Sequence, residues 1–408
     1  MKETASRRNW LKYSAALGGL LTGCSTSPEA KHEDEEEGAS RLGRVVSQYG
    51  ERSIEQRVMR IPGTSRHGEA SSSTTPLAQT MGIITPSSLH FERHHSGIPT
   101  ILSPQHDLLV HGLVNDPIVI SMEELKRFPS ASQICFVECA GNGGREWGSK
   151  VAADVQSGFG LASCSEWTGV KLSTILEEVG LKKNARWIIA EGGDACRMNR
   201  SLPIEKALQD ILVAYGQNGE ALRPEQGYPL RLVVPGWEGN VSVKWLKQIK
   251  VVDEPLASRE ETSKYTDLMP DGKARQYSFV MEAKSVITSP SGGQRLTKRG
   301  YCEITGLAWT GKGRIDSVDI TVDGGETWRK AKLQEPRLPM AFTRFRYGWD
   351  WEGNVVLKIA SRATDESGYT QPSRDALIGV RGHNSHYHFN GIKFWQINAD
   401  GSVVHVEA

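Results

Sequence analysis

The most informative stretch of the chain reads Cys135-Phe136-Val137-Glu138-Cys139-Ala140-Gly141-Asn142-Gly143-Gly144. The residues from Gln133 to Val137 have the pattern of a strand, which places Cys139 at its end. Small residues directly after Cys139 let a thiolate approach a large cofactor and leave the backbone free to point N–H groups at a ligand. A soft thiolate suits soft or highly charged metals. For an isolated cysteine, a buried place in the core is the alternative.

Cysteine spacing narrows the kinds of metal site that fit. Cys135 lies four residues before Cys139 and would share one face of the strand with it, so only one of the two needs to reach a cofactor. The sequence contains no Cys-x-x-Cys pair, which argues against structural zinc and iron–sulfur clusters. Six cysteines in 408 residues are also too sparse for a disulfide framework.

Length and composition predict a soluble globular protein of about two domains after a leader segment. Charged residues make up 24% and hydrophobic residues 38% of the chain, which is ordinary for such proteins. The formal net charge of +1 produces no strong global field, so the charge balance indicates no nucleic-acid partner.

Residues 1–24 predict an export signal. Ser6-Arg7-Arg8-Asn9-Trp10-Leu11-Lys12 has the pattern of a twin-arginine signal, and the apolar run Tyr13–Leu21 is too short for a permanent anchor. That route exports proteins already folded around a cofactor, so the leader predicts a cofactor enzyme in the periplasm. A chance Arg-Arg pair before an amphipathic helix is the alternative.

The signal ends in Leu21-Thr22-Gly23-Cys24, which resembles a lipoprotein cleavage box. An acylated Cys24 would tether the mature protein to a membrane, whereas cleavage nearby would remove Cys24. Residues 25–75 read as a polar linker with the acidic run Glu33–Glu37 and a short helix over Ser47–Arg60. From Ser25 onward, no stretch has the apolar length of a bilayer-spanning helix.

Residues 76–270 predict a domain that mixes helices and strands without regular βαβ alternation. Ser121 predicts a helix N-cap, with Glu124 three residues later. The expected helix over Val170–Val179 is amphipathic. Strands are expected at four further places: Leu108–Leu113, Ile118–Ile120, Trp187–Ala190 and Leu230–Val234.

Residues 271–408 predict an antiparallel β-sandwich of immunoglobulin type. Ser317–Val322 alternates in polarity, Asp323-Gly324-Gly325 predicts a hairpin turn, and Thr327–Ala331 returns. Further strands are expected over Phe342–Trp351 and Val355–Ala360, while helical periodicity is nearly absent. The two domains together indicate the α+β class, and no repeat of fixed period is present.

Four more motifs accompany the Cys139 loop. Adjacent arginine and histidine in Phe91-Glu92-Arg93-His94-His95 suit a phosphate or a polar heterocycle, although a surface turn or a metal site is an alternative. The others are Tyr215-Gly216-Gln217-Asn218-Gly219, Gly227-Tyr228-Pro229-Leu230-Arg231 and Val243-Lys244-Trp245-Leu246. In content, order and separation, the motifs resemble the pattern of the sulfite oxidase family. The resemblance covers roughly residues 80 to 400.

The resemblance implies a molybdenum atom bound by a pterin dithiolene and one protein thiolate, which Cys139 would supply. It also implies that the pterin and its phosphate are held by Arg93, His95, Asp194, Arg231, Lys244 and Trp245. The segment after Asp194 is shorter than is usual in the family. Gln226 replaces a common histidine, a change that keeps hydrogen bonding but removes any imidazole charge.

Two further residues match the family's catalytic positions. Tyr265 lies nineteen residues after Leu246, and its phenol would donate a hydrogen bond near the metal. Arg381, within Val380-Arg381-Gly382-His383-Asn384-Ser385, would be the arginine that the sandwich contributes to the pocket. A core or surface tyrosine and an ordinary ion pair at a sheet end are the alternatives.

One departure concerns the substrate. Members of the family that take free sulfite have two arginines where this chain has Gly143 and Gly144. A small dianion loses a bidentate partner there and the site gains room, although Arg145 would compensate if it pointed inward. With the segments Glu260–Arg275 and Val322–Leu333, this resembles the sulfane dehydrogenase branch, whose members oxidise sulfur held on a carrier protein and act with a c-type cytochrome.

The sequence therefore predicts a periplasmic molybdopterin oxidoreductase that is homodimeric through its sandwich domain. It has no Cys-x-x-Cys-His motif, so no haem is expected on this chain and a c-type cytochrome would accept the electrons. Three alternatives remain: a dehydrogenase for free sulfite, a methionine sulfoxide reductase, whose relatives usually lack the sandwich, and a non-catalytic sandwich protein that binds carriers.

Overall fold

The computed structural model describes residues 45–63, 69–148 and 152–406 of the chain. The predicted export signal, Cys24 and the acidic run lie outside these residues. Residues 45–56 belong to one unit and the residues from Arg57 onward to another. The helix predicted over Ser47–Arg60 is not formed. The side chains of residues 45–57 are exposed, and a short helix that buries no apolar face is marginal in water.

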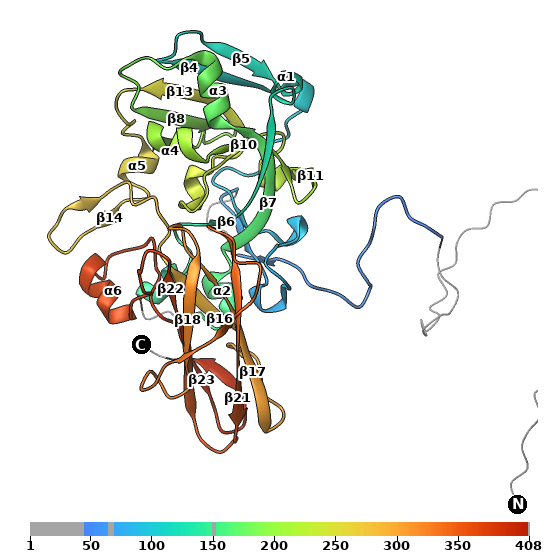
Figure 1. Cartoon of the computed structure of the whole chain (residues 1–408), viewed down its shortest axis with the longest axis vertical. Helices are drawn as coiled ribbons and strands as arrows, with labels where there is room; N and C mark the ends of the chain where they lie inside the picture. Colours follow the sequence, from blue (N-terminus) through green and yellow to red (C-terminus); the bar gives the residue numbers. More distant parts are fainter. Residues whose placement is uncertain (1–44, 64–68, 149–151, 407–408) are drawn as a thin grey trace, which may run out of the picture. The chain divides into compact units, whose positions relative to one another are not determined.

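Two five-stranded sheets build the first domain (Figure 1). One has the order β11 (Glu220–Ala221), β10 (Leu212–Gln217), β7 (Ala162–Lys171) and β6 (Ser130–Glu138), with β12 (Arg231–Val233) also paired to β10. The other has the order β5 (Ile118–Ser121), β4 (Asp107–Gly112), β13 (Leu246–Val252), β8 (Trp187–Gly192) and β9 (Asn199–Pro203). Among the strand pairs of these two sheets in the described residues, β13 and β4 are parallel and the others are antiparallel. The strands predicted in this domain are all formed.

Short helices connect the strands of the first domain: α1 (Met122–Leu125), α2 (Val155–Phe159), α3 (Leu172–Val179), α4 (Ile204–Gln209) and α5 (Arg259–Thr262). The capping box predicted at Ser121 is confirmed, because its hydroxyl accepts from the backbone N–H of Glu124 and the Glu124 carboxylate accepts from the N–H of Ser121. Helix α3 begins two residues later than predicted because Val170 still pairs with β6 and β10.

A small three-stranded sheet precedes these elements and holds one predicted site residue. It has the order β1 (Ile61–Pro62), β2 (Ser72–Thr74) and β3 (Glu92–Arg93). Strands β1 and β2 therefore lie inside the segment predicted to be linker. Ser72 pairs with Arg93 in the β2–β3 ladder, so this sheet fixes the backbone of Arg93.

The second domain is a sandwich of two antiparallel sheets, as predicted (Figure 1). One has the order β16 (Lys284–Ser289), β17 (Gly300–Trp309), β21 (Thr343–Trp351) and β20 (Lys332–Leu333). The other has the order β19 (Arg329–Lys330), β18 (Ile315–Thr321), β22 (Leu357–Asp365), β23 (Phe394–Ile397) and β24 (Val403–His405). The hairpin predicted at residues 323–325 joins β18 to its antiparallel partner β19.

Two shorter elements complete the chain. The hairpin β14 (Asp267–Leu268) and β15 (Ala274–Arg275) follows α5. Helix α6 (Arg374–Arg381), which the near absence of helical periodicity did not predict, begins at the N-cap Ser373. Its Arg374 donates to the carbonyls of Glu146 and Trp147. This contact ties the second domain to the segment that follows Cys139.

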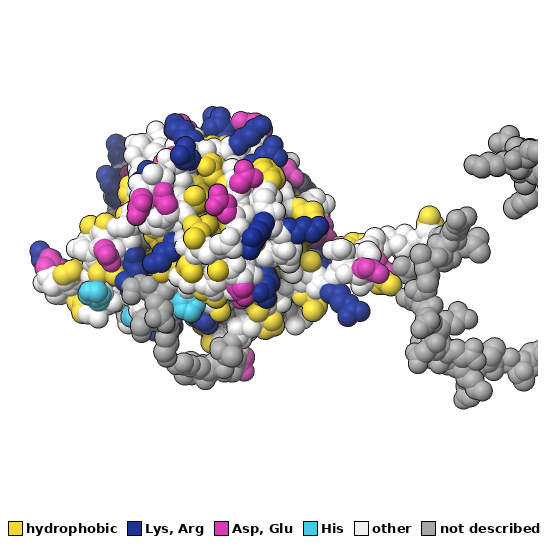
Figure 2. Space-filling view, turned by 90° about the horizontal axis from the view of Figure 1, so that it is seen from below, with side chains coloured by type: hydrophobic (Ala, Val, Ile, Leu, Met, Phe, Trp, Pro, Cys, Tyr) yellow, Lys and Arg dark blue, Asp and Glu magenta, His cyan; other side chains and the backbone are white. Residues whose placement is uncertain are grey.

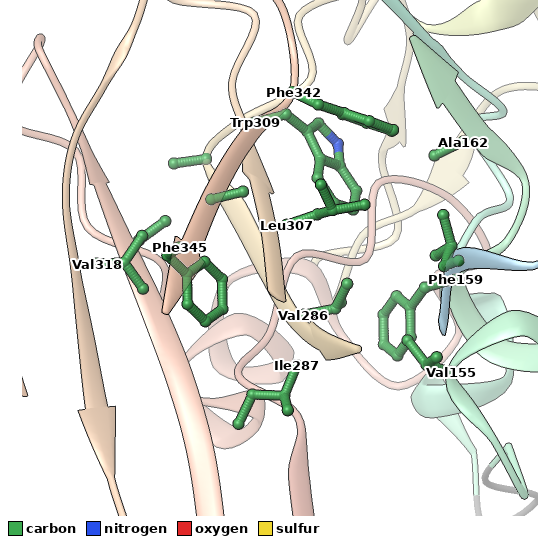
Figure 3. Packing of buried hydrophobic residues seen from close by; sticks show 14 of the residues in the cluster. Val155, Phe159, Ala162, Val286, Ile287, Leu307, Trp309, Val318, Phe342 and Phe345 are labelled. Atoms are coloured by element: carbon green, nitrogen blue, oxygen red, sulfur yellow. The ribbon is translucent and has the colours of Figure 1, made fainter. Parts of the chain in front are cut away.

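One apolar core joins the two domains. Figure 3 shows Val155 and Phe159 of α2 close to Val286 of β16, with Trp309 and Phe345 from the sandwich further along the same cluster. A second core lies within the first domain and includes the buried face of α3. Burying apolar surface contributes about 25 cal/mol per Å² to the stability of this interface between the domains. The segment after Cys139 is therefore held by residues of both domains.

The surface carries no extended field of one sign on the face seen in Figure 2, where basic and acidic side chains are interspersed. This agrees with the formal net charge of +1. Within the described part of the chain, no helix combines the length and apolar character needed to cross a bilayer.

Candidate active site

A pocket of about 670 Å³, open mouth included, lies in the first domain. Ligand sites typically measure roughly 300–1,000 Å³. Its lining includes eight of the nine residues predicted for the site: Arg93, His95, Cys139, Asp194, Arg231, Lys244, Trp245 and Tyr265. Arg93 lies on β3 of the small sheet and Arg231 on β12, while the other six lie in loops next to strands or helices. The fold thus gathers side chains that are up to 172 positions apart in sequence.

Cys139 directly follows β6, as the sequence predicted. Its backbone N–H donates to the carbonyl of Leu161 at 2.9 Å, and its carbonyl accepts from the N–H of Asn142. Burial raises the pKa of the thiol, while the N–H of Gly141 and the charge of Arg93 act in the opposite direction. The thiol is half-buried. Cys135, by contrast, is fully buried in the core beneath the pocket.

Arg93 on β3 and His95 just after it are two of the predicted pocket residues. The Arg93 guanidinium donates to the carbonyls of Ser71 and His94. The hydroxyl of Tyr265 and Nε2 of His95 are hydrogen-bonded at 3.0 Å. Burial, with the nearby positive charges of Arg93 and Lys244, lowers the pKa of His95 to about 4. The imidazole is therefore neutral at neutral pH and can accept a proton or donate one in a hydrogen bond.

Lys244 has three partners for its three donors. Its ammonium group donates to the carbonyls of Arg93 and Glu225 and lies 2.8 Å from Nδ1 of His94. Nε2 of His94 in turn pairs with the carboxylate of Glu92 at 2.8 Å. Burial lowers the pKa of Lys244 well below its usual value. His94 and Glu92 were not predicted as site residues, although both stand in the motif that named Arg93 and His95.

Arg231 is a buried cation without a carboxylate partner in the described chain. It donates to the carbonyls of Gln226 and Ser242 at 3.1 Å and stacks over Trp167 at 4.7 Å. Burial lowers its pKa to about 10. The amide of Gln226, which replaces the family's histidine, donates to the carbonyl of Phe91 at 2.9 Å.

Asp194 is buried, and both of its carboxylate oxygens accept hydrogen bonds. One carboxylate oxygen accepts from Ser96 and from the thiol of Cys196, and the other accepts from the N–H of Met198. Trp245 has a positive φ of 52° and donates from its indole N–H to the carbonyl of Pro224. These contacts fix two walls of the pocket. Cys196 thus lies beside the site, while Cys164 is buried in the core and Cys302 is half-buried in β17.

Arg381 does not line this pocket. It ends α6, is buried, and lies 3.8 Å from Asp267 with Nη1 making no hydrogen bond. The side chain borders a separate, smaller cavity with His388 and Asn390. A role of Arg381 in the pocket stays a prediction, while the contact with Asp267 and the position at the end of α6 place the side chain outside this lining.

The two glycines after the Cys-Ala-Gly-Asn loop do not open the pocket directly. Gly143 has a φ of +80°, and a Cβ at this position would lie 3.0 Å from Phe389 and 3.1 Å from Phe159. Aromatic side chains therefore fill the space beside Gly143. A Cβ at Gly144 would lie 3.3 Å from the carbonyl oxygen of His386, and neither glycine belongs to the pocket lining. Arg145 is exposed and absent from the lining, so it does not replace the missing arginines.

The donor set fits a phosphorylated pterin. Arg93, Arg231 and Lys244 line one pocket, and none of them forms an ion pair with a carboxylate in the described residues. Nε2 of His90 also belongs to this lining, is buried and has no hydrogen-bond partner. Buried polar groups normally have partners. An anionic, hydrogen-bonding ligand would satisfy these groups, and the thiol of Cys139 stands beside them.

Comparison with known proteins agrees with this donor set. Residues 95–260 match the model of the oxidoreductase molybdopterin binding domain, and residues 275–394 match the model of the Mo-co oxidoreductase dimerisation domain. The crystal structure of the sulfane dehydrogenase SoxCD from Paracoccus pantotrophus aligns with a TM-score of 0.88 and 46% identity over 90% of this chain and 96% of that one. The chain belongs to the sulfite oxidase family.

As a member of the sulfite oxidase family, the chain is a molybdopterin-dependent oxidoreductase with a dimerisation domain at its C-terminal end. The interpretation as a non-catalytic sandwich protein is therefore wrong. Curated relatives include nitrate reductases [NADH] from Ulva prolifera, 31% identical over 74% of this chain, and from Solanum lycopersicum, 32% identical over 79%. The chain spans 39% and 40% of the length of these two proteins.

Proposed function

We propose that this protein oxidises sulfane sulfur carried on a cysteine of a partner protein and passes the electrons to a c-type cytochrome. The observation that carries the proposal is the alignment with a sulfane dehydrogenase over nearly the whole of both chains, at 46% identity. The nitrate reductases are less similar and much longer than this chain. A sulfur group is therefore favoured over nitrate as the substrate.

The composition of the pocket supports a substrate that is not a small free dianion. Of the arginines in the described chain, only Arg93 and Arg231 line the pocket. Arg93 donates to two backbone carbonyls and Arg231 to the carbonyls of Gln226 and Ser242. We assign both to the cofactor. The positions after Asn142 carry no guanidinium that could clamp sulfite from the side of Cys139.

The cofactor, when bound, supplies the two-electron redox chemistry. Each oxidation adds one oxygen atom from water to the sulfane sulfur and releases two protons and two electrons. The thiolate of Cys139, which lines the pocket, would hold the metal. The hydroxyl of Tyr265 keeps its proton, because burial raises the pKa of the phenol. It can donate that proton in a hydrogen bond to the oxygen gained by sulfur. The hydroxyl is free to do so in the His95 tautomer that carries its proton on Nε2, because the imidazole then donates to the phenol oxygen.

The proposal also includes export to the periplasm and assembly with other chains, both inferred from sequence features. The twin-arginine pattern at Arg7 and Arg8 directs the folded protein to the periplasm, with tethering through Cys24 as a variant of the same location. Because the chain has no Cys-x-x-Cys-His motif, the electrons leave for another protein. The sandwich domain would form a homodimer, in line with the dimerisation model that it matches.

Free sulfite is the second candidate, favoured by the cationic groups that remain in the pocket. The two are separated by steady-state assays of the molybdenum-loaded protein with a c-type cytochrome as acceptor. The substrates are a single-cysteine protein converted to its persulfide, free sulfite, and, in the reverse direction with a reduced dye, nitrate. The proposal expects the highest kcat/KM for the persulfide. A higher kcat/KM for sulfite or for nitrate would contradict it.

A further inference from the structure

Arg200 is a fully buried cation that no sequence motif pointed to. It lies on β9, with 1% of its surface exposed. Its guanidinium lies 3.0 Å from the carboxylate of Glu238 and 3.4 Å from that of Glu261, and it also donates to the side-chain oxygen of Asn240. The planar fork of an arginine can serve several acceptors at fixed angles, which the ammonium group of a lysine cannot do.

The partners of Arg200 belong to two segments that shape the pocket. Asn240 is itself part of the lining, and its amide donates to Glu238 at 2.9 Å. Glu261 lies on α5, four residues before Tyr265, and its carboxylate also accepts from the backbone N–H and the hydroxyl of Ser201. Arg200 and its neighbour on β9 therefore fasten the segment that carries Tyr265 to the second sheet.

The ring of Tyr265 lies directly against Arg200. The guanidinium carbon is 5.1 Å from the ring centroid, within the range of a cation–π contact. On another side the ring packs against Tyr387 at 5.3 Å. Tyr265 also has a φ of +53°. A positive φ is unfavourable for any residue other than glycine, and it persists only where the surrounding contacts impose it.

We propose that Arg200 is a positioning residue for the reaction: it stacks against Tyr265 and clamps the 259–266 segment, so that the hydroxyl stays directed at His95 and the pocket. Arg200 does not line the pocket. It acts through Tyr265, and the inference rests on the function proposed above. Misplacement of a reacting group by about 1 Å can cost on the order of 100-fold in rate.

The test compares four forms of the molybdenum-loaded, full-length protein: wild type, Arg200→Lys, Tyr265→Phe and the double variant. Arg200→Lys keeps the buried positive charge beside Glu238 and Glu261 but removes the planar fork. Lys206→Met is the matched control, because Lys206 is also a buried cation, ion-paired with Asp210 at 2.7 Å and stacked on Trp237 at 5.3 Å, and it is absent from the pocket lining.

Arg200→Lys is expected to lower kcat by roughly 10- to 100-fold and to change KM by less than about threefold. In the Tyr265→Phe background the same substitution should cost less than about twofold, because contacting residues act as a unit. Lys206→Met should leave kcat within about twofold of wild type. An equal effect of Arg200→Lys in both backgrounds, or an effect no larger than that of the control, would overturn the proposal.

Two readouts do not depend on turnover. Hydrogen exchange of the backbone over residues 259–266 should quicken in Arg200→Lys and not in Lys206→Met, and the EPR spectrum of Mo(V) should change only in the former. Should Arg200→Lys fail to fold, Glu261→Gln loosens the same clamp from its other end and should give the same pattern. A wild-type protein without activity on persulfide would reject the proposed function, whereas unchanged exchange and EPR spectra would reject the role of Arg200.

Discussion

The hydroxyl of Tyr265 lies 3.0 Å from Nε2 of His95, although 170 positions separate the two residues in the sequence. His95 follows the small sheet of the first domain, and Tyr265 follows α5 near the boundary of the two domains. The rings meet edge to face. Both residues line the pocket together with Cys139, and their hydrogen bond fixes the position of the hydroxyl oxygen in the site.

Tyr265→Phe tests the hydroxyl. The change removes one hydrogen-bond donor and keeps the ring, so kcat on the persulfide should fall roughly 100- to 1,000-fold, the cost of losing one donor aimed at a developing oxygen charge. Tyr215→Phe is the control, because Tyr215 packs beside the core of the first domain and lies outside the pocket lining. Steady-state kinetics measure both, and a Tyr265→Phe protein with wild-type kcat would remove the phenol from the mechanism.

Cys139→Ser tests the thiolate. Turnover should fall more than about 100-fold, since losing a group that merely orients a metal ligand already costs roughly 10- to 100-fold. Cys135→Ala should keep turnover and lose only about 1 kcal/mol of unfolding free energy, because Cys135 is buried in the core four residues away. An equal loss of activity in the two variants would contradict the assignment of Cys139 as the metal-binding thiolate.

Arg231→Gln tests the cation assigned to the cofactor. An amide can still donate to the carbonyls of Gln226 and Ser242 but supplies no charge to a phosphate. The molybdenum content of the purified protein should fall below about half of the wild-type value, since a charged hydrogen bond contributes about 1.5–3 kcal/mol. Arg223→Gln, which breaks an ion pair with Glu220 outside the lining, should leave the content unchanged. Full loading of Arg231→Gln would contradict the assignment.

The pH dependence of stability tests the buried histidines. Burial, and then the charges of Arg231 and Lys244, lower the pKa of His90 to about 3. The unfolded chain binds this proton near pH 6.5. Between pH 6.5 and about 3 the unfolded state therefore holds more protons, and the free energy of unfolding falls as the pH falls.

His90→Gln should flatten this slope by up to about 1.4 kcal/mol per pH unit, the value for one proton. Denaturant unfolding of the protein at a series of pH values between about 4 and 6 measures the slope. The exposed His383 provides the control His383→Gln, which should leave it unchanged. An unaltered slope in His90→Gln would show that this histidine is not held neutral in the folded state.

Local pattern was sufficient for much of the fold. Period-2 alternation and turn residues predicted β18 and its return strand, and the Ser121 capping box was read correctly because its chemistry is contained in four residues. Helix α6 was not predicted, because its stability comes from tertiary contacts such as those of Arg374 with the segment after Cys139. The helix expected over residues 47–60 failed for the converse reason, since no apolar surface covers it.

For the site, the family's motifs brought together eight of nine predicted residues, because each motif lies on an element whose place the fold determines. Residues that act through long-range contacts could not be found in this way. Arg200 belongs to no recognisable sequence motif. Its proposed role follows only from its contact with Tyr265, which lies 65 positions away in the sequence. Arg381 was expected in the pocket, but its direction depends on Asp267 and on the end of α6.

The most direct test of the account is X-ray absorption at the molybdenum edge of the loaded protein, measured for wild type, Cys139→Ser and the control Cys135→Ala. If Cys139 binds the metal, wild type and Cys135→Ala have the same number of sulfur neighbours around molybdenum and Cys139→Ser has one fewer. An identical sulfur shell in loaded Cys139→Ser and wild type would show that another group holds the metal.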